Sequence, residues 1–181
     1  MLRQILVLVV QVYLTADYCD PLVPGVFSFE TDSFFVDSIE AKPDRLDLLP
    51  RKLEAVREFA ALPESASLAA ANKRISNILR QAHQKGETPG FVEGAAFAEQ
   101  VEHNLYHALR QASHKAAPQF EKGNYTEYLK SFAVLKAPVD AFFDGVMVMA
   151  EDPAVRRKRL NLLYELQFEM NRVADISKLA A

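Results

Sequence analysis

The spacing of apolar residues along the chain changes character near residue 45. From Leu46 onward they return every three or four positions, which is the spacing that gives an α-helix one apolar face. Before that point, prolines, a glycine and clustered phenylalanines interrupt any sustained period. The pattern therefore predicts an all-α fold, a helical bundle over residues 46–181, with an irregular N-terminal appendage over residues 1–45.

Short breaks separate the successive helices of the predicted bundle. Pro63 interrupts the first helix, because a proline disfavours helical geometry in the residue before it. The second helix is predicted over Ser65–Gln84 and ends at Gly86, since glycine readily takes the left-handed conformation found after helix ends. A third helix is predicted over Ala95–Lys115, where apolar residues follow a heptad-like spacing.

Capping signals predict the remaining helix boundaries. Gly123 suits a helix end, and Asn124 is expected to cap the next helix while Glu127 reaches back to its amide. Pro138 is predicted to begin a further helix, because the first turn needs no amide hydrogen from it. Asp152 repeats this arrangement as the cap before a proline that opens the last helix. The whole pattern predicts about five or six helices.

Composition and charge exclude several classes of protein. Half of the 181 residues are apolar and a quarter are charged, as in ordinary globular domains. The formal net charge of −3 excludes a global basic bias, so any charge that binds RNA must be local. Cys19 is the only cysteine, which excludes an intrachain disulfide and a cysteine zinc site and favours a reducing, cytoplasmic location.

Ile5–Leu14 is the one segment that resembles a targeting sequence. It follows Arg3 and has the length of the apolar part of a signal peptide, but the next residues make a poor cleavage site. It is too short to cross a bilayer, which takes about 20 apolar residues. We expect no membrane segment and interpret it as a buried strand or helix, with its β-branched residues favouring a strand. A signal peptide is the alternative.

No group of residues predicts a catalytic centre. The chain has no glycine-rich phosphate loop and no grouping typical of nucleophilic catalysis. His103 and His107 lie four residues apart on one predicted helix face, but Asn104 stands where a zinc protease has its catalytic glutamate. We therefore expect no catalytic residue, no metal site and no cofactor held by this chain.

A polar stripe along the predicted helix Ser65–Gln84 is the best candidate for contact with RNA. It consists of residues at helical spacing opposite the apolar face: Lys73, Asn77, Arg80 and Gln84. Lysine and arginine can neutralise phosphates, while asparagine and glutamine can hydrogen-bond exposed base edges. The same pattern is also typical of a face that only meets water, so both interpretations remain open at this point.

The only dense basic run in the chain is Arg156–Arg159. Because four consecutive residues spread around a helix, only one or two of them can contact phosphate, and the others must point inward or pair with acids. Arg157 and Lys158 are the candidates for RNA contact. We expect the acids Asp140, Asp144 and Asp175 to join helices by pairing with Arg156, Arg159 or Arg172.

Two longer segments carry a resemblance to a known family. They read LAAANKRISNIL, Leu68–Leu79, and PVDAFFDGVMVMAEDPAVRRKRLNLLYEL, Pro138–Leu166. In this order, and closed by RVADISKL, they resemble the beta subunit of bacterial glycine–tRNA ligase. The second segment is also similar to the DALR anticodon-binding domains of arginine–tRNA ligases. The apolar residues of that segment are expected in the core: Phe142, Phe143, Val146, Met147 and Met149.

The resemblance implies a bundle of the DALR anticodon-binding type that receives the anticodon of glycine tRNA. It also implies that aminoacylation, with its ATP and Mg²⁺, takes place on a separate alpha subunit, so this chain is part of a ligase without holding the catalytic site. The implied partners are glycine tRNA, the alpha subunit and the rest of the beta subunit, in a heterotetramer. Since the family's beta subunit is longer, we expect a fragment or truncated copy, with residues 1–45 as a remnant of a larger body or a linker.

The RNA-facing residues that we predict are Lys73, Asn77, Arg80, Arg157 and Lys158. Lys158 stands where the family usually has asparagine. Two alternatives remain beside RNA recognition. One is a structural or subunit-docking helical module with little RNA binding of its own, and the other is a free-standing bundle that has lost the ligase role.

Overall fold

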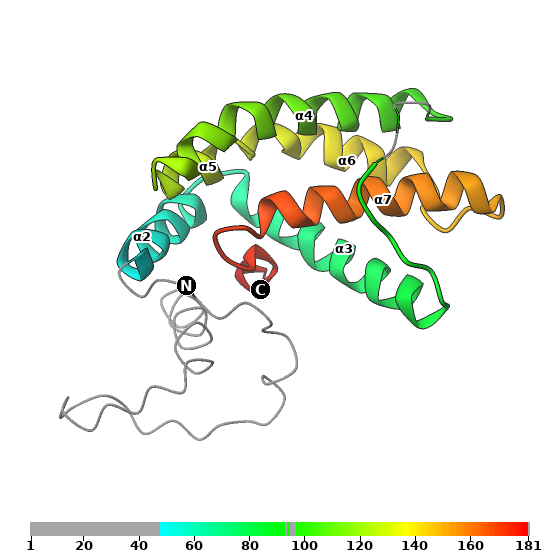
Figure 1. Ribbon diagram of the computed structural model, residues 1–181, viewed down its shortest axis with the longest axis horizontal. Helices are drawn as coiled ribbons and strands as arrows, with labels where there is room; N and C mark the ends of the chain where they lie inside the picture. The colour runs from blue at the N-terminus through cyan, green and yellow to red at the C-terminus, as the bar shows by residue number, and fades with distance from the viewer. Residues whose placement is uncertain (1–47, 93, 95–96, 181) are drawn as a thin grey trace, which may run out of the picture.

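The computed structural model describes residues 48–92, 94 and 97–180, and all regular secondary structure in these residues is helical (Figure 1). In chain order the elements are α2 (Leu49–Ala60), α3 (Ser65–Gln84), α4 (Gln100–Glu121), α5 (Tyr125–Lys130), the 3₁₀ turn η3 (Ala133–Leu135), α6 (Lys136–Gly145), α7 (Pro153–Met170) and the 3₁₀ turn η4 (Ile176–Leu179). The predicted all-α fold is confirmed for this part of the chain. The predicted segment 1–45, with Ile5–Leu14, lies outside the described residues.

The helices pack around one apolar core. Figure 1 shows α4 lying along α6 and α7 lying along α3, while α2 and α5 pack together at one end and η4 folds back against α3. All six α-helices of the described residues contribute large and fully buried side chains, among them Phe59, Leu68, Leu105, Tyr128, Phe142 and Leu160. Burying one such side chain stabilises the fold by about 1.5–3 kcal/mol, so the apolar stripes of the sequence are the main source of stability.

Buried polar contacts set the direction of α3 against α7. Asn72 is fully buried, and its Nδ2 donates to Oδ1 of Asn171 at 2.6 Å. One turn further along α3, Ser76 Oγ accepts a hydrogen bond of 2.6 Å from Nε2 of Gln167. Since the partners on α7 move backward as α3 moves forward, the two helices are antiparallel. The end of α3 therefore lies beside the start of α7.

The helix boundaries confirm some of the predicted signals and correct others. α3 has the predicted bounds, and Gly123 has a φ of +71° at the end of α4. Asp152 caps α7 as predicted, accepting amide hydrogens at 2.7 and 3.3 Å. Asn124 is the N-cap residue of α5 as predicted, but its side chain makes no capping hydrogen bond, because its Nδ2 donates to Oε1 of Gln119 at 3.2 Å.

α4 begins later and ends later than predicted. It covers Gln100–Glu121 instead of Ala95–Lys115. The carboxylate of Glu102 explains the start, because its Oε2 accepts the amide hydrogens of Ala98 and Glu99 at 2.8 and 2.7 Å. Such bonds satisfy amides that the first turn of a helix leaves without partners.

The segment around Pro138 is the clearest correction to the predicted core. α6 begins at Lys136, so Pro138 is its third residue rather than its first. The helix ends at Gly145, and the following residues form a loop to α7. The helical burial pattern predicted for this segment therefore does not continue past Gly145. Phe142 is buried as predicted, but Met147 is 73% exposed and does not belong to the core. The other three predicted core residues, Phe143, Val146 and Met149, pack against the core and are partly buried.

Candidate nucleic-acid interface

The structure places the whole polar stripe on the open side of α3. Lys73, Asn77, Arg80 and Gln84 are all exposed, opposite the buried residues of that helix. Nη2 of Arg80 donates to Oδ1 of Asn77 at 2.9 Å, one helical turn away. The neighbouring Arg74 does not belong to the stripe. Its guanidinium lies 4.1 Å from the ring centroid of Phe143. The stripe thus presents two cations and two amides to solvent along one helix face.

The basic run at the start of α7 divides into an inner and an outer pair. Arg157 and Lys158 are exposed, whereas Arg156 and Arg159 form ion pairs inside the molecule. Nε of Arg156 lies 2.8 Å from Oε1 of Glu87. The expectation that consecutive residues spread around the helix is therefore confirmed.

The predicted aspartate partners of these arginines are wrong. Arg159 pairs with Glu102, and Arg172 lies 3.7 Å from Glu169 of its own helix region. Glu87 and Glu102 lie near the end of α3 and at the start of α4, where both reach α7. Asp175 instead accepts from Ser177 in its own segment. Asp140 accepts from Ser67 of α3 at 3.2 Å and from Lys136 at 2.9 Å, and the hydrogen bond with Lys136 raises the pKa of that lysine.

A buried ion pair holds the start of α4 against α7. Nε of Arg159 donates to Oε1 of Glu102, and Nη1 of the same guanidinium donates to the carbonyl of Met147 at 2.9 Å. The Glu102 side chain is 1% exposed and that of Arg159 is 8% exposed. Buried charges are tolerated when each has further hydrogen-bond partners, and both residues meet that condition here.

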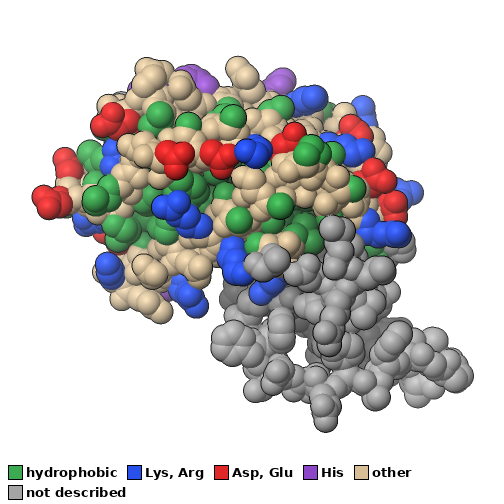
Figure 2. Space-filling view, turned by 180° about the vertical axis from the view of Figure 1, so that it is seen from behind, with side chains coloured by type: hydrophobic (Ala, Val, Ile, Leu, Met, Phe, Trp, Pro, Cys, Tyr) green, Lys and Arg blue, Asp and Glu red, His purple; other side chains and the backbone are tan. Residues whose placement is uncertain are grey.

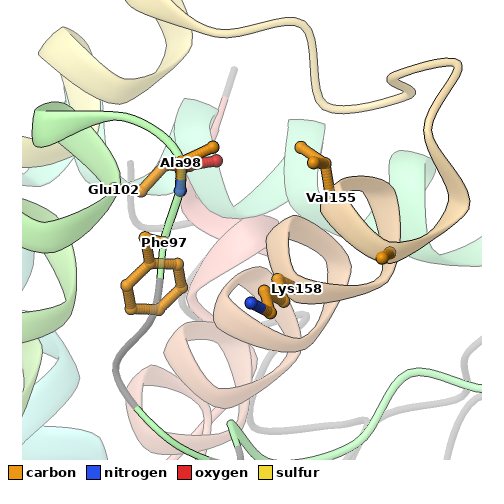
Figure 3. Close-up of a pocket in the computed structure, with 6 residues that line it drawn as sticks. Phe97, Ala98, Glu102, Val155 and Lys158 are labelled. Carbon is orange, nitrogen blue, oxygen red and sulfur yellow. The ribbon is translucent and has the colours of Figure 1, made fainter.

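Beside this ion pair, a small pocket separates the chain entering α4 from the first turns of α7 (Figure 3). Its volume is about 270 Å³, and it is lined by Phe97, Ala98, Glu102, Ala154, Val155 and Lys158. Figure 3 shows the amino end of Lys158 directed toward the side of the pocket that holds Phe97. The pocket therefore combines apolar walls with one exposed cation at its rim.

Neither a metal site nor a membrane helix is found in the described part of the chain. No group of three or more His, Cys, Asp or Glu within residues 48–92, 94 and 97–180 could hold a metal ion. His103 and His107 share a face as predicted, with ring centroids 6.4 Å apart, but His103 packs edge-on against Phe97 at 5.4 Å. None of the helices in these ranges is long and apolar enough to span a bilayer.

Sequence reasoning missed a cluster of aromatic rings on the outer side of α7. We call Phe91, Tyr164 and Phe168 the aromatic surface: the ring centroid of Phe91 lies 5.6 Å from that of Tyr164 and 5.2 Å from that of Phe168. The cluster depends on a contact between distant parts of the sequence. Figure 1 shows the chain between α3 and α4 crossing over α7, and Gly90, next to Phe91, bonds to Asn161 of that helix. Tyr164 and Phe168 lie four residues apart, about one turn of α7, and this aromatic pair is the signal that could have revealed them.

Charges of both signs are present on the face opposite to that of Figure 1. Figure 2 shows acidic and basic side chains mixed over its upper and middle parts, and separate lysine and arginine side chains toward its lower edge. This agrees with the net charge of −3. Any attraction for a polyanion must therefore come from particular side chains and not from the overall field.

Comparison with known proteins gives a family match and close relatives. The family described as DALR anticodon binding domain matches residues 68–176. The glycine–tRNA ligase beta subunit of Thiobacillus denitrificans is 54% identical over 147 residues, which cover 81% of this chain and 21% of that protein. The subunit of Delftia acidovorans is 52% identical over 147 residues, 81% of this chain and 21% of the relative.

A third relative extends the match slightly. The beta subunit of Nitrosomonas europaea is 48% identical over 158 residues, covering 85% of this chain and 22% of that protein. The chain thus spans about a fifth of the length of the curated relatives that it matches. The resemblance carried by Leu68–Leu79 and Pro138–Leu166 is confirmed.

Proposed function

The chain belongs to the DALR anticodon-binding domain family, and from that premise we propose that it binds the anticodon stem and loop of glycine tRNA. The observation that carries this proposal is the family match over residues 68–176. The exposed polar stripe on α3 supports it, because Lys73 and Arg80 can meet phosphates while Asn77 lies between them with an amide. Arg157 and Lys158 supply a second pair of exposed cations on α7.

The proposed chemistry is recognition without catalysis. In this proposal the chain supports glycyl-tRNA formation as a piece of a ligase beta subunit, and ATP and Mg²⁺ are used on a separate alpha subunit. Its partners are glycine tRNA, that alpha subunit and the rest of the beta subunit, assembled as a heterotetramer in the cytoplasm. Because few cations take part, binding by the chain alone should be weak, and because the contacts are electrostatic it should weaken further as salt rises.

Fluorescence anisotropy with the 181-residue chain tests the proposal. We expect a glycine tRNA to bind more tightly than the same tRNA with its anticodon replaced. Equal affinities for the two would overturn anticodon recognition, and the absence of binding to either at low salt would overturn RNA binding altogether.

A matched pair of charge reversals tests the polar stripe. Arg80→Glu should weaken binding of glycine tRNA roughly tenfold and lower the slope of log K against log salt, because one phosphate contact is lost. Lys115→Glu makes the same change at an exposed site on α4 and should have a much smaller effect. Similar losses from both variants would remove Arg80 from the interface.

A second candidate function is docking on the rest of a synthetase. It is favoured by two exposed apolar side chains, Val134 at 65% and Met147 at 73% exposure. Size-exclusion chromatography of the chain with a separately produced remainder of a related beta subunit tests this function. A stable complex that Met147→Lys disrupts, together with no affinity for tRNA, would favour docking over recognition.

A further inference from the structure

Two of the three rings of the aromatic surface are exposed, while Tyr164 is partly buried against the core. Phe91 is 51% exposed and Phe168 is 46% exposed. The two rings meet at an interplanar angle of 81°, and the rings of Phe91 and Tyr164 meet at 83°. Neighbouring exposed rings of this kind mark a binding surface more often than isolated apolar residues do.

Hydrogen bonds on both sides of Phe91 fix the loop that carries it. The amide of Gly90 donates to Oδ1 of Asn161 at 3.1 Å, and Nδ2 of Asn161 donates to the carbonyl of Phe91 at 3.4 Å. The amide of Val92 donates to Oε2 of Glu165 at 3.2 Å. The backbone around Phe91 is thus anchored to α7 before any ligand arrives, which lowers the entropy lost on binding.

The charges beside the aromatic surface favour a polyanion over an apolar partner. Arg157, Tyr164 and Phe168 follow one another at helical spacing along one side of α7. Nη1 of Arg110 lies 2.9 Å from Oε1 of Glu165, the carboxylate that holds the loop, and the arginine side chain remains 48% exposed. Glu165 is therefore neutralised locally, while Arg157 adds positive charge at one end of the surface.

We propose that the aromatic surface is a stacking platform for unpaired bases of an RNA loop, with Arg157 and Arg110 meeting the adjacent phosphates. This inference rests on the proposed function, and it adds a base-binding surface on α7 to the phosphate-binding stripe on α3. Base stacking on aromatic side chains suits every base, because each has a flat π face. A protein partner could also use exposed rings and arginines, and it becomes one outcome of the test.

The experiment uses the 181-residue chain and a hairpin RNA with the anticodon stem and loop of glycine tRNA, carrying 2-aminopurine in the loop. Phe91→Leu and Phe168→Leu keep apolar side chains but remove the rings. Each should weaken binding roughly tenfold and reduce the change in 2-aminopurine fluorescence on binding, because base–aromatic stacking contributes about 1–3 kcal/mol per base. Phe91→Tyr keeps a ring and should bind like the parent chain.

Val134→Ala is the matched control, since Val134 is an exposed apolar residue on η3. It should leave both the affinity and the fluorescence unchanged. Thermal unfolding of each variant identifies any loss of fold. Cross-linking of the unsubstituted chain with 4-thiouridine in the loop gives a readout that depends on no variant, and we expect the linked peptide to contain Phe91, Tyr164 or Phe168.

The outcomes separate this inference from the proposed function. If the parent chain binds with anticodon preference but Phe91→Leu and Phe168→Leu bind equally well, the platform is refuted and tRNA binding stands. If the parent chain binds no RNA, both ideas fail. If the leucine variants keep full RNA affinity while Phe91→Asp abolishes association with another part of the synthetase, the surface is a protein-docking site and the platform is overturned.

Discussion

The inner pair and the outer pair of the basic run Arg156–Arg159 have different structural roles. Arg156 and Arg159 bind Glu87 and Glu102, the first pair partly buried and the second buried, whereas Arg157 and Lys158 are exposed. All four follow one another in the sequence and carry the same charge. The difference arises only from the 100° step between neighbours on a helix. A cluster of basic residues on a helix is therefore no measure of the charge available to a ligand.

The largest expected effect comes from the inner pair. Arg159→Met should lower the free energy of unfolding by about 3–5 kcal/mol, because Glu102 would remain buried without its partner charge. Arg157→Met, at the exposed neighbouring site, should change it by less than about 0.5 kcal/mol. Urea denaturation followed by circular dichroism measures both. Equal costs would mean that the ion pair has no special importance for stability.

A double substitution sharpens the assignment. Glu102→Gln together with Arg159→Met removes both charges but leaves an acceptor for the amides of Ala98 and Glu99. The double variant should recover part of the stability lost in the single one, since its interior holds no unpaired charge. If the two substitutions were instead simply additive, the cost would not come from a stranded carboxylate.

The partly exposed member of the inner pair should matter less. Arg156→Ala should cost about 1 kcal/mol of unfolding free energy, because its pair with Glu87 is partly open to water. It would also lose the 2.8 Å hydrogen bond from Nη1 to the carbonyl of Ala150. Glu87→Gln keeps that second bond and should cost less. If Glu87→Gln instead lowered the unfolding free energy in urea more than Arg156→Ala does, the contact with the carbonyl of Ala150 would be negligible.

The outer pair should affect binding rather than folding. Arg157→Glu should leave the unfolding midpoint in urea unchanged and weaken binding of glycine tRNA roughly tenfold at low salt. The weakening should shrink as salt rises, because the contact is electrostatic. A destabilised but fully binding variant would reverse the roles assigned to the two pairs.

The smallest effect is expected at Lys158. Lys158→Asn introduces the residue usual at this position in the family that the sequence resembles, and it retains a hydrogen-bonding side chain at the rim of the pocket. We expect a change of about threefold or less in tRNA affinity, measured by anisotropy beside Arg157→Glu. A loss as large as that of Arg157→Glu would assign a phosphate contact to Lys158.

Local signals in the sequence predicted much of the fold but little of its long-range chemistry. The bounds of α3 and the cap at Asp152 depend on neighbours within one or two turns, so pattern and capping rules predicted them. Met147 was placed wrongly because its apolar character suggested a helix that continues past Gly145. The acidic partners of Arg156 and Arg159 depend on which helix ends meet in space, and no local pattern contains that information.

The candidate site shows the same division. Lys73, Asn77 and Arg80 could be found from helical spacing alone, because a stripe needs only one helix. The aromatic surface could not, since Phe91 reaches Tyr164 only when a loop crosses α7. Its role, like that of the stripe, remains a prediction that the experiments above test.

The carboxylate of Glu102 has a consequence for how the molecule opens. Its two oxygens bind the amides of Ala98 and Glu99 on one side and Arg159 on the other, and Arg159 in turn holds the carbonyl of Met147. Three stretches far apart in the sequence thus share one anchor. Amide protons of the chain entering α4 should therefore exchange with deuterium only as fast as the packing of α7 on α4 loosens, so a surface segment belongs to the same cooperative unit as a core helix.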